Sequence, residues 1–141
     1  MERGGFGMYA TITLREAINV LNKRYERILG SNRQVEVKYN LEQYMESYSD
    51  WGGFIETDVY YGVKATIKYN KNIGAVVARS TVTIGENSLN DDLEDELNKS
   101  YNDSDLVVDY VRLPRFSSND GINYDKEVRI YFKEKRKKLV K

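Results

Sequence analysis

The stretch that decides the fold is TLREAINVLNKRYERILGSNRQVEVKYNLE, residues 13–42, in which a helical period is followed by a strand period. Thr13 and Glu16 have the spacing of a capping box, in which each side chain can hydrogen-bond the backbone of the other. Gly30 suits a left-handed helix end, so we predict a helix over residues 14–29. The apolar positions at helical spacing are Leu14, Ala17, Ile18, Leu21, Tyr25, Ile28 and Leu29.

Alternation of apolar and polar residues begins after Gly30, over residues 35–42, and predicts a half-buried strand. Five further segments alternate or are rich in β-branched residues, and we predict strands there: 7–12, 59–69, 76–84, 106–113 and 128–132. Two segments break the pattern and are predicted as loops, 44–53 and 115–124. The triplet Asn70-Lys71-Asn72 is the expected hairpin turn.

A second helix is expected to start at Ser88 as its cap, with an apolar stripe formed by Leu89, Leu93, Leu97 and Tyr101. The resulting order is β-α-β-β-β-α-β-β. It predicts the α+β class, with a largely antiparallel sheet of about six strands and two helices on one face. We expect one globular domain over residues 1–134 and a basic C-terminal tail over residues 135–141.

The 141-residue chain contains neither cysteine nor histidine. This composition excludes disulfides, zinc sites of the Cys/His type and the nucleophile–histidine pairs of many hydrolases. The remaining Asp, Glu, Lys, Tyr and Ser residues form no recognisable catalytic constellation. We therefore expect a protein that is not an enzyme, with no catalytic residues, no cofactor and no bound metal.

Two observations bear on location. No apolar run approaches the roughly 18 residues of a membrane span. The first residues also lack the apolar stretch of a signal peptide. We expect a cytoplasmic protein, the cytoplasm of a host cell included, with no membrane partner.

Charge is balanced in total, at 22 basic and 22 acidic residues, but not along the chain. Residues 86–111 carry nine acidic groups and one basic group. Carboxylates in the first helical turn favour the positive end of the helix dipole, whereas those further in need another explanation. They form either a solvated face or a surface that imitates a phosphate backbone and enters a basic groove. The carboxylates at the centre of this block are Asp91, Asp92, Glu94, Asp95 and Glu96.

The opposite charge collects in residues 112–141, which carry ten basic and four acidic groups. A basic cluster near the C-terminus is a candidate nucleic-acid contact or, alternatively, a solvated chain end. A third interpretation is that the cluster folds back on the acidic helix and neutralises it. Tyrosine supplies 12 of the 17 aromatic residues, which fits strand packing or stacking on nucleobases. The basic cluster consists of Lys133, Lys135, Arg136, Lys137 and Lys138.

An aromatic cluster falls in the predicted loop around Gly52 and Gly53. Its side chains either plug one end of the core, which we favour, or present an interaction patch. The cluster consists of Tyr44, Tyr48, Trp51 and Phe54.

These features favour a non-catalytic protein that binds another macromolecule. The most specific version is a small inhibitor that a phage or other mobile element directs against a host nucleic-acid-binding defence protein (anti-CRISPR-like). The acidic helix would then be a nucleic-acid mimic, and the partner a protein with a basic groove. The alternative is a nucleic-acid-binding module that uses the basic tail and exposed tyrosines. A third hypothesis is a small structural protein that self-assembles into a homo-oligomer.

Overall fold

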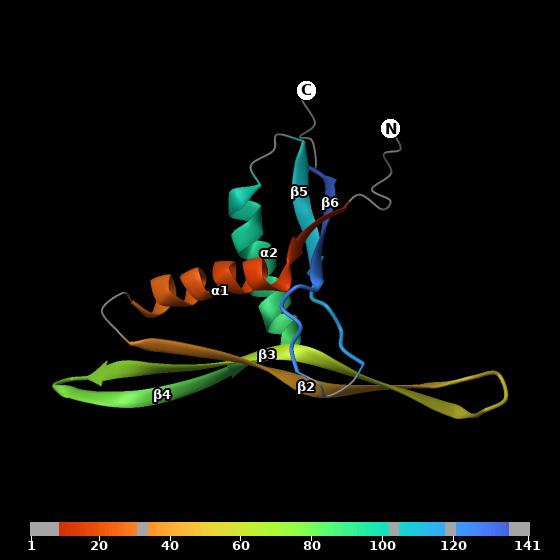
Figure 1. The fold of residues 1–141 in the computed structure, drawn as a ribbon, viewed down its shortest axis with the longest axis horizontal. Helices are drawn as coiled ribbons and strands as arrows, with labels where there is room; N and C mark the ends of the chain where they lie inside the picture. Colours follow the sequence, from red (N-terminus) through yellow and green to blue (C-terminus); the bar gives the residue numbers. More distant parts are fainter. Residues whose placement is uncertain (1–8, 31–33, 102–104, 118–120, 136–141) are drawn as a thin grey trace, which may run out of the picture.

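The computed structural model describes residues 9–30, 34–101, 105–117 and 121–135. The α+β class and the predicted element order are both confirmed (Figure 1). The two helices are α1 (Leu14–Leu29) and α2 (Glu86–Ser100). The strands are β1 (Tyr9–Thr13), β2 (Val35–Ser49), β3 (Ile55–Ile73), β4 (Val76–Ile84), β5 (Leu106–Arg112) and β6 (Glu127–Glu134).

Helix α1 begins and ends as its sequence predicts. The Glu16 amide donates to Thr13 Oγ1 at 3.1 Å, and the Thr13 amide donates to Glu16 Oε1 at 3.1 Å, which completes the capping box. The backbone amide of Leu14, the first residue of the helix, donates to the Lys126 carbonyl at 2.8 Å. Gly30 ends the helix at φ +95°, a backbone angle that favours glycine.

The strands of the described ranges form two three-stranded antiparallel sheets, β1-β6-β5 and β2-β3-β4, rather than the one sheet expected. Both helices lie between the sheets: α2 packs on β5 and also contacts β3, and α1 contacts β1, β2 and β6. Alternation shows which side chains are buried but not which strands pair, so the sequence pattern did not reveal the division. The isolated pairing of Tyr61 with Phe116 joins the long sheet to the segment that follows β5.

A continuous core fills the space between the layers. It contains the apolar stripe of α1 as far as Tyr25, the three leucines of α2, and the inward faces of β3, β5 and β6. Two asparagines of α2 fix the helix to β5: Asn98 accepts from the Val108 amide at 2.9 Å, and Asn90 accepts from the Leu113 amide at 3.3 Å. Neither described helix combines the length and apolarity needed to cross a membrane.

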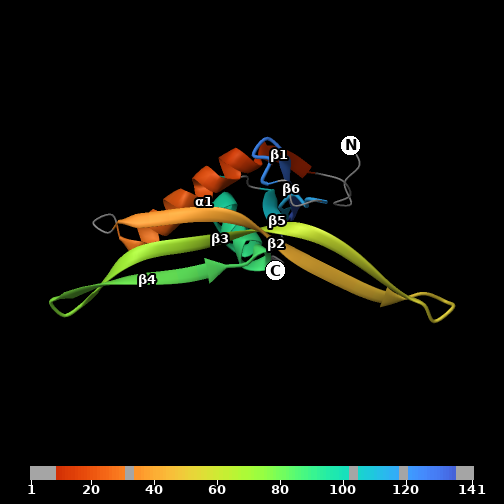
Figure 2. The same ribbon diagram turned by 60° about the horizontal axis from the view of Figure 1, so that its bottom comes forward.

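The long sheet extends past the helices at both ends (Figures 1 and 2). At one end, β2 and β3 continue as a two-stranded ribbon, and at the other, β3 and β4 continue to their turn. The core therefore covers only the middle of this sheet.

Four local predictions are wrong, each for a physical reason. Residues 44–49 belong to β2 instead of a loop, because there tyrosines and charges share one face and the apolar alternation is lost. The β3–β4 turn lies at Gly74, at φ +63°, rather than at Asn70-Lys71-Asn72, since glycine adopts that angle without strain. Helix α2 starts at Glu86 with Gly85 as its N-cap, three residues before the start that a Ser88 cap would give. Ile28 is 60% exposed, because the buried stripe of α1 ends one turn earlier.

Candidate functional site

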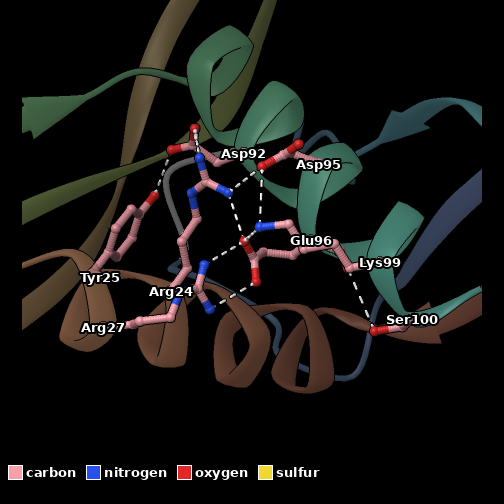
Figure 3. Close-up of polar contacts among 8 residues, drawn as sticks. All are labelled: Arg24, Tyr25, Arg27, Asp92, Asp95, Glu96, Lys99 and Ser100. Carbon is pink, nitrogen blue, oxygen red and sulfur yellow. Dashed lines mark hydrogen bonds and ion pairs between the residues drawn. The ribbon is translucent and has the colours of Figure 1, made fainter.

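The acidic residues of α2 face the cations of α1 rather than solvent alone (Figure 3). Arg24 Nη1 donates to Asp95 Oδ2 at 2.7 Å and to Glu96 Oε2 at 2.6 Å. Arg27 donates to both Glu96 oxygens, at 3.1 and 2.8 Å, and Lys99 Nζ lies 3.3 Å from Glu96 Oε2. Glu96 therefore sits, only 9% exposed, among three cations, of which Arg24 and Arg27 belong to α1 and link the two helices.

The geometry of the cluster shifts the pKa values of its carboxyl groups. Hydrogen bonds from Arg27 and then Arg24, working against burial, lower the pKa of Glu96 to about 2. The Arg24 hydrogen bond likewise lowers the pKa of Asp95. Asp92 accepts from the Tyr25 hydroxyl at 3.2 Å and lies 3.6 Å from Arg24 Nη2. Three of the five predicted partner-binding carboxylates thus stabilise the α1–α2 contact, and their negative charge is largely compensated within the chain.

The other two predicted carboxylates, Asp91 and Glu94, lie outside that network. Burial raises the pKa of Glu94, and the neighbouring carboxylates of Asp91 and Asp109 add to the effect. The structure does not gather the five acidic residues into one exposed patch. The nucleic-acid-mimic hypothesis consequently depends on two residues instead of five.

The predicted aromatic cluster lies at and near the far end of the β2–β3 ribbon. Tyr48, Trp51 and Phe54 are exposed, and Tyr44 is half-buried where it stacks on Tyr60 with ring centroids 5.4 Å apart. The favoured interpretation as a core plug is therefore wrong for Tyr48, Trp51 and Phe54, because the ribbon carries them beyond the core. Tyr44 remains against α2, where its hydroxyl accepts from the Glu86 amide at 3.3 Å. The exposure of the other three fits the alternative, an interaction patch.

The predicted basic cluster is described only in part. Lys133, on β6, lies 3.6 Å from Asp109 Oδ1, and the Lys135 amide donates to the Asp105 carbonyl at 2.9 Å. Arg136, Lys137 and Lys138 lie outside the described residues.

A further surface emerges on the open side of the β1-β6-β5 sheet, opposite the core. The pairing register places Tyr9, Tyr131 and Tyr110 in one row across the three strands. The Tyr110 and Tyr131 rings stack with centroids 4.4 Å apart, and the Tyr9 ring lies 5.4 Å from that of Tyr131. The neighbouring row brings Arg129 directly opposite Arg112. We name these five residues the tyrosine–arginine face.

The two arginines of this face are an unfavourable pair in isolation, since like charges directly opposite each other destabilise a sheet. A cation–π contact offsets part of this repulsion: the Arg129 guanidinium lies 5.0 Å from the centroid of the Tyr9 ring. Hydrogen bonds to the Tyr131 hydroxyl, from Arg129 and to a smaller extent from Arg112, lower the pKa of Tyr131.

A basic pocket of about 450 Å³ adjoins the face and shares Arg112 and Arg129 with it. Arg115 and Lys126 add two further cations, and Glu127 is the one carboxylate among its lining residues, 3.5 Å from Arg129. The Lys126 ammonium donates to the Arg115 carbonyl at 2.8 Å and lies 4.7 Å from the Phe116 ring centroid. Face and pocket together form a surface that combines exposed aromatic rings with an excess of positive charge.

Sequence reasoning missed the tyrosine–arginine face as a site. The alternation of residues 128–132 does place Arg129 and Tyr131 on one side of a strand, which was an available signal. The row appears only when β1 and β5 pair on either side of β6, and no local pattern specifies that pairing. Comparison of the chain with protein-family models, with curated proteins and with solved structures finds no match.

Proposed function

We propose that this protein is a non-catalytic nucleic-acid-binding protein that holds a single strand on the tyrosine–arginine face. The observation that carries the proposal is the pair of adjacent cross-strand rows, three tyrosines beside two directly opposed arginines. Aromatic side chains on an open sheet face stack on unpaired bases, and nearby cations follow the phosphate backbone.

The surroundings of the face support this function. The basic pocket extends the positive surface through Arg115 and Lys126. Lys133 lies on β6 beyond Tyr131, in the same alternating set as Arg129 and Tyr131. The predicted basic tail follows β6 directly in sequence. This is the alternative function expected from the sequence, with its contact surface extended from the tail to the sheet.

The inhibitor hypothesis has less support from the geometry. Arg24, Arg27 and Lys99 compensate the carboxylates that a nucleic-acid mimic would present. A phosphate-like surface needs uncompensated charge to enter a basic groove. We therefore place the binding function on the basic surface rather than on α2.

The test is the affinity of a fluorescein-labelled 20-nucleotide polythymidine strand, measured by fluorescence anisotropy at several salt concentrations. Tyr110→Ala should weaken binding about 5- to 150-fold, the range for loss of one stacked base. Arg112→Gln should weaken it too, and should reduce the log–log salt slope by about 0.7, the value for one phosphate contact of a single strand.

Matched controls come from surfaces far from the face. Tyr48 is 48% exposed against 47% for Tyr110, so Tyr48→Ala removes a comparable ring. Arg79→Gln is the matched control for Arg112→Gln. The Arg79 guanidinium pairs with Glu36 at 2.9 Å. Failure of the wild-type protein to bind the strand at low salt would overturn the proposal, as would equal losses in the control variants.

A further inference from the structure

The β2–β3 ribbon beyond the core, residues 44–60, is here named the arm. It is two-stranded, because β4 pairs only with Ala65–Ile73 of β3 and the arm part of β3 pairs with β2 alone. Figure 2 shows it projecting past the helices. Its turn is well formed: Asp50 Oδ1 accepts from the amides of Gly52 and Phe54, both at 2.9 Å.

The two faces of the arm differ in chemistry. Side chains alternate along the unbroken β2–β3 register, so every second cross-strand pair shares a face. One face carries the pairs Tyr44–Tyr60, Glu46–Asp58 and Tyr48–Glu56. The other, the uncharged face, carries the pairs Met45–Val59, Ser47–Thr57 and Ser49–Ile55.

The uncharged face continues the core-facing side of the long sheet. Val63, Ala65 and Ile67 of β3 belong to the same alternating set, and all three are buried beneath the helices. Further along the arm, Val59, Met45 and Ile55 are 46–73% exposed, because the helices no longer cover the sheet. Trp51 and Phe54 add two exposed aromatic side chains at the turn.

Such a ribbon is a poor structure for an isolated monomer. A two-stranded hairpin is marginally stable in water unless a hydrophobic face is covered. Exposed apolar side chains gathered on one face of such a ribbon mark an interaction site.

The charge distribution indicates what covers it. Residues 39–63 contain five acidic residues and no lysine or arginine. Four of the five lie on the face opposite the uncharged one: Glu46, Glu56 and Asp58 in the arm, and Glu42 just before it. The fifth, Asp50, lies in the turn. Two arms can therefore pack through their uncharged faces while the carboxylates of the opposite face point away from the contact on both copies.

We propose that the uncharged face of the arm docks on the same face of a second copy of this chain, as a two-fold symmetric dimer. A self-complementary patch is what such symmetry requires. The exposed Trp51 and Phe54 of the adjoining turn, at roughly 150–250 Å² each, add to the three aliphatic side chains of the face. Together these side chains approach the ~800 Å² that each partner gives to a standard interface. The tyrosine–arginine face is not used in this contact.

The experiment measures mass by analytical ultracentrifugation and follows the fluorescence of Trp51, the single tryptophan, over a dilution series. The wild-type chain should sediment at twice 16.4 kDa at high concentration, and its emission should move to longer wavelength as dilution exposes Trp51. The triple variant Met45→Thr, Ile55→Thr, Val59→Thr keeps strand propensity and the fluorophore, and it should remain a monomer with no emission change.

The control variant alters the opposite end of the same sheet. Ile73, Val76 and Val77 are 61–64% exposed, and their replacement by threonine should leave the dimer intact. A wild-type chain that is monomeric at every concentration would refute the proposal. A dimer that survives the arm variant, or dissociates in the control variant, would refute it as well. Circular dichroism establishes that both variants are folded.

Discussion

Replacement of Glu96 by glutamine tests whether the α1–α2 cluster stabilises the fold. The variant keeps the shape of the side chain but removes the charge that faces Arg24, Arg27 and Lys99. A shift of the pKa of Glu96 from 4.5 to about 2 corresponds to roughly 3 kcal/mol of preference for the ionised form. Because Arg27 is partly exposed and solvent screens its contribution, we expect a loss of about 2–3 kcal/mol in the free energy of unfolding.

The stabilisation by Glu96 should depend on pH. A carboxyl group whose folded-state pKa is lowered contributes its full stability above its unfolded pKa, and that contribution is lost as pH falls toward 2. The stability difference between wild type and Glu96→Gln should therefore be largest at pH 7, and should shrink between pH 4.5 and 2. Urea denaturation followed by circular dichroism at pH 7, 4 and 2.5 measures it.

Glu94→Gln is the matched control on the same helix. Burial raises the pKa of Glu94, so loss of its charge should not destabilise the protein at pH 7. A Glu96→Gln variant that loses less than about 0.5 kcal/mol, or the same amount at every pH, would show that the cluster contributes little to stability.

Four other substitutions have definite expected outcomes. Leu93→Ala removes a fully buried side chain of α2 and should cost about 2–5 kcal/mol in urea denaturation, whereas Ile28→Ala, on the exposed end of α1, should stay within about 0.5 kcal/mol. Gly62→Ala would place a Cβ into the Glu86 carboxylate and 2.8 Å from the Tyr44 ring, and a loss of about 1–3 kcal/mol in the same assay is expected. Burial raises the pKa of Glu86, so Glu86→Gln should be at least as stable as wild type at pH 7, and that advantage should disappear as the pH falls below 4.5.

Much of the secondary structure was predictable because its signals are local. The Thr13–Glu16 capping box and the apolar stripe from Leu14 to Tyr25 define α1 within a few residues. Strand β4 and the leucine stripe of α2 follow from equally short patterns. Most of the arm was not predicted as strand. One of its faces carries tyrosines and carboxylates, and the other mixes apolar side chains with Ser and Thr. The apolar–polar alternation of a half-buried strand is therefore not visible there.

The sites depended on contacts between distant segments, which local patterns do not encode. The carboxylates of α2 are conspicuous in sequence, but nothing near them shows that Arg24 and Arg27 of α1 lie alongside. Likewise, Tyr9 and Tyr110 join Tyr131 only through the pairing of three separate strands. The sequence therefore identified the carboxylates of α2 but not the cations beside them, and it did not identify the tyrosine–arginine face.

The strand order also determines when the protein can fold during its synthesis. The β2-β3-β4 meander is formed by consecutive segments, Val35 to Ile84, and can pair as soon as those residues leave the ribosome. The central strand of the other sheet, Glu127–Glu134, is synthesised last, and β1 has to wait for it although it emerges first. Closing so long a loop is slow relative to hairpin formation. Throughout that interval β1 and β5 lack the strand with which both pair, so chaperone demand should be greatest just before β6 emerges.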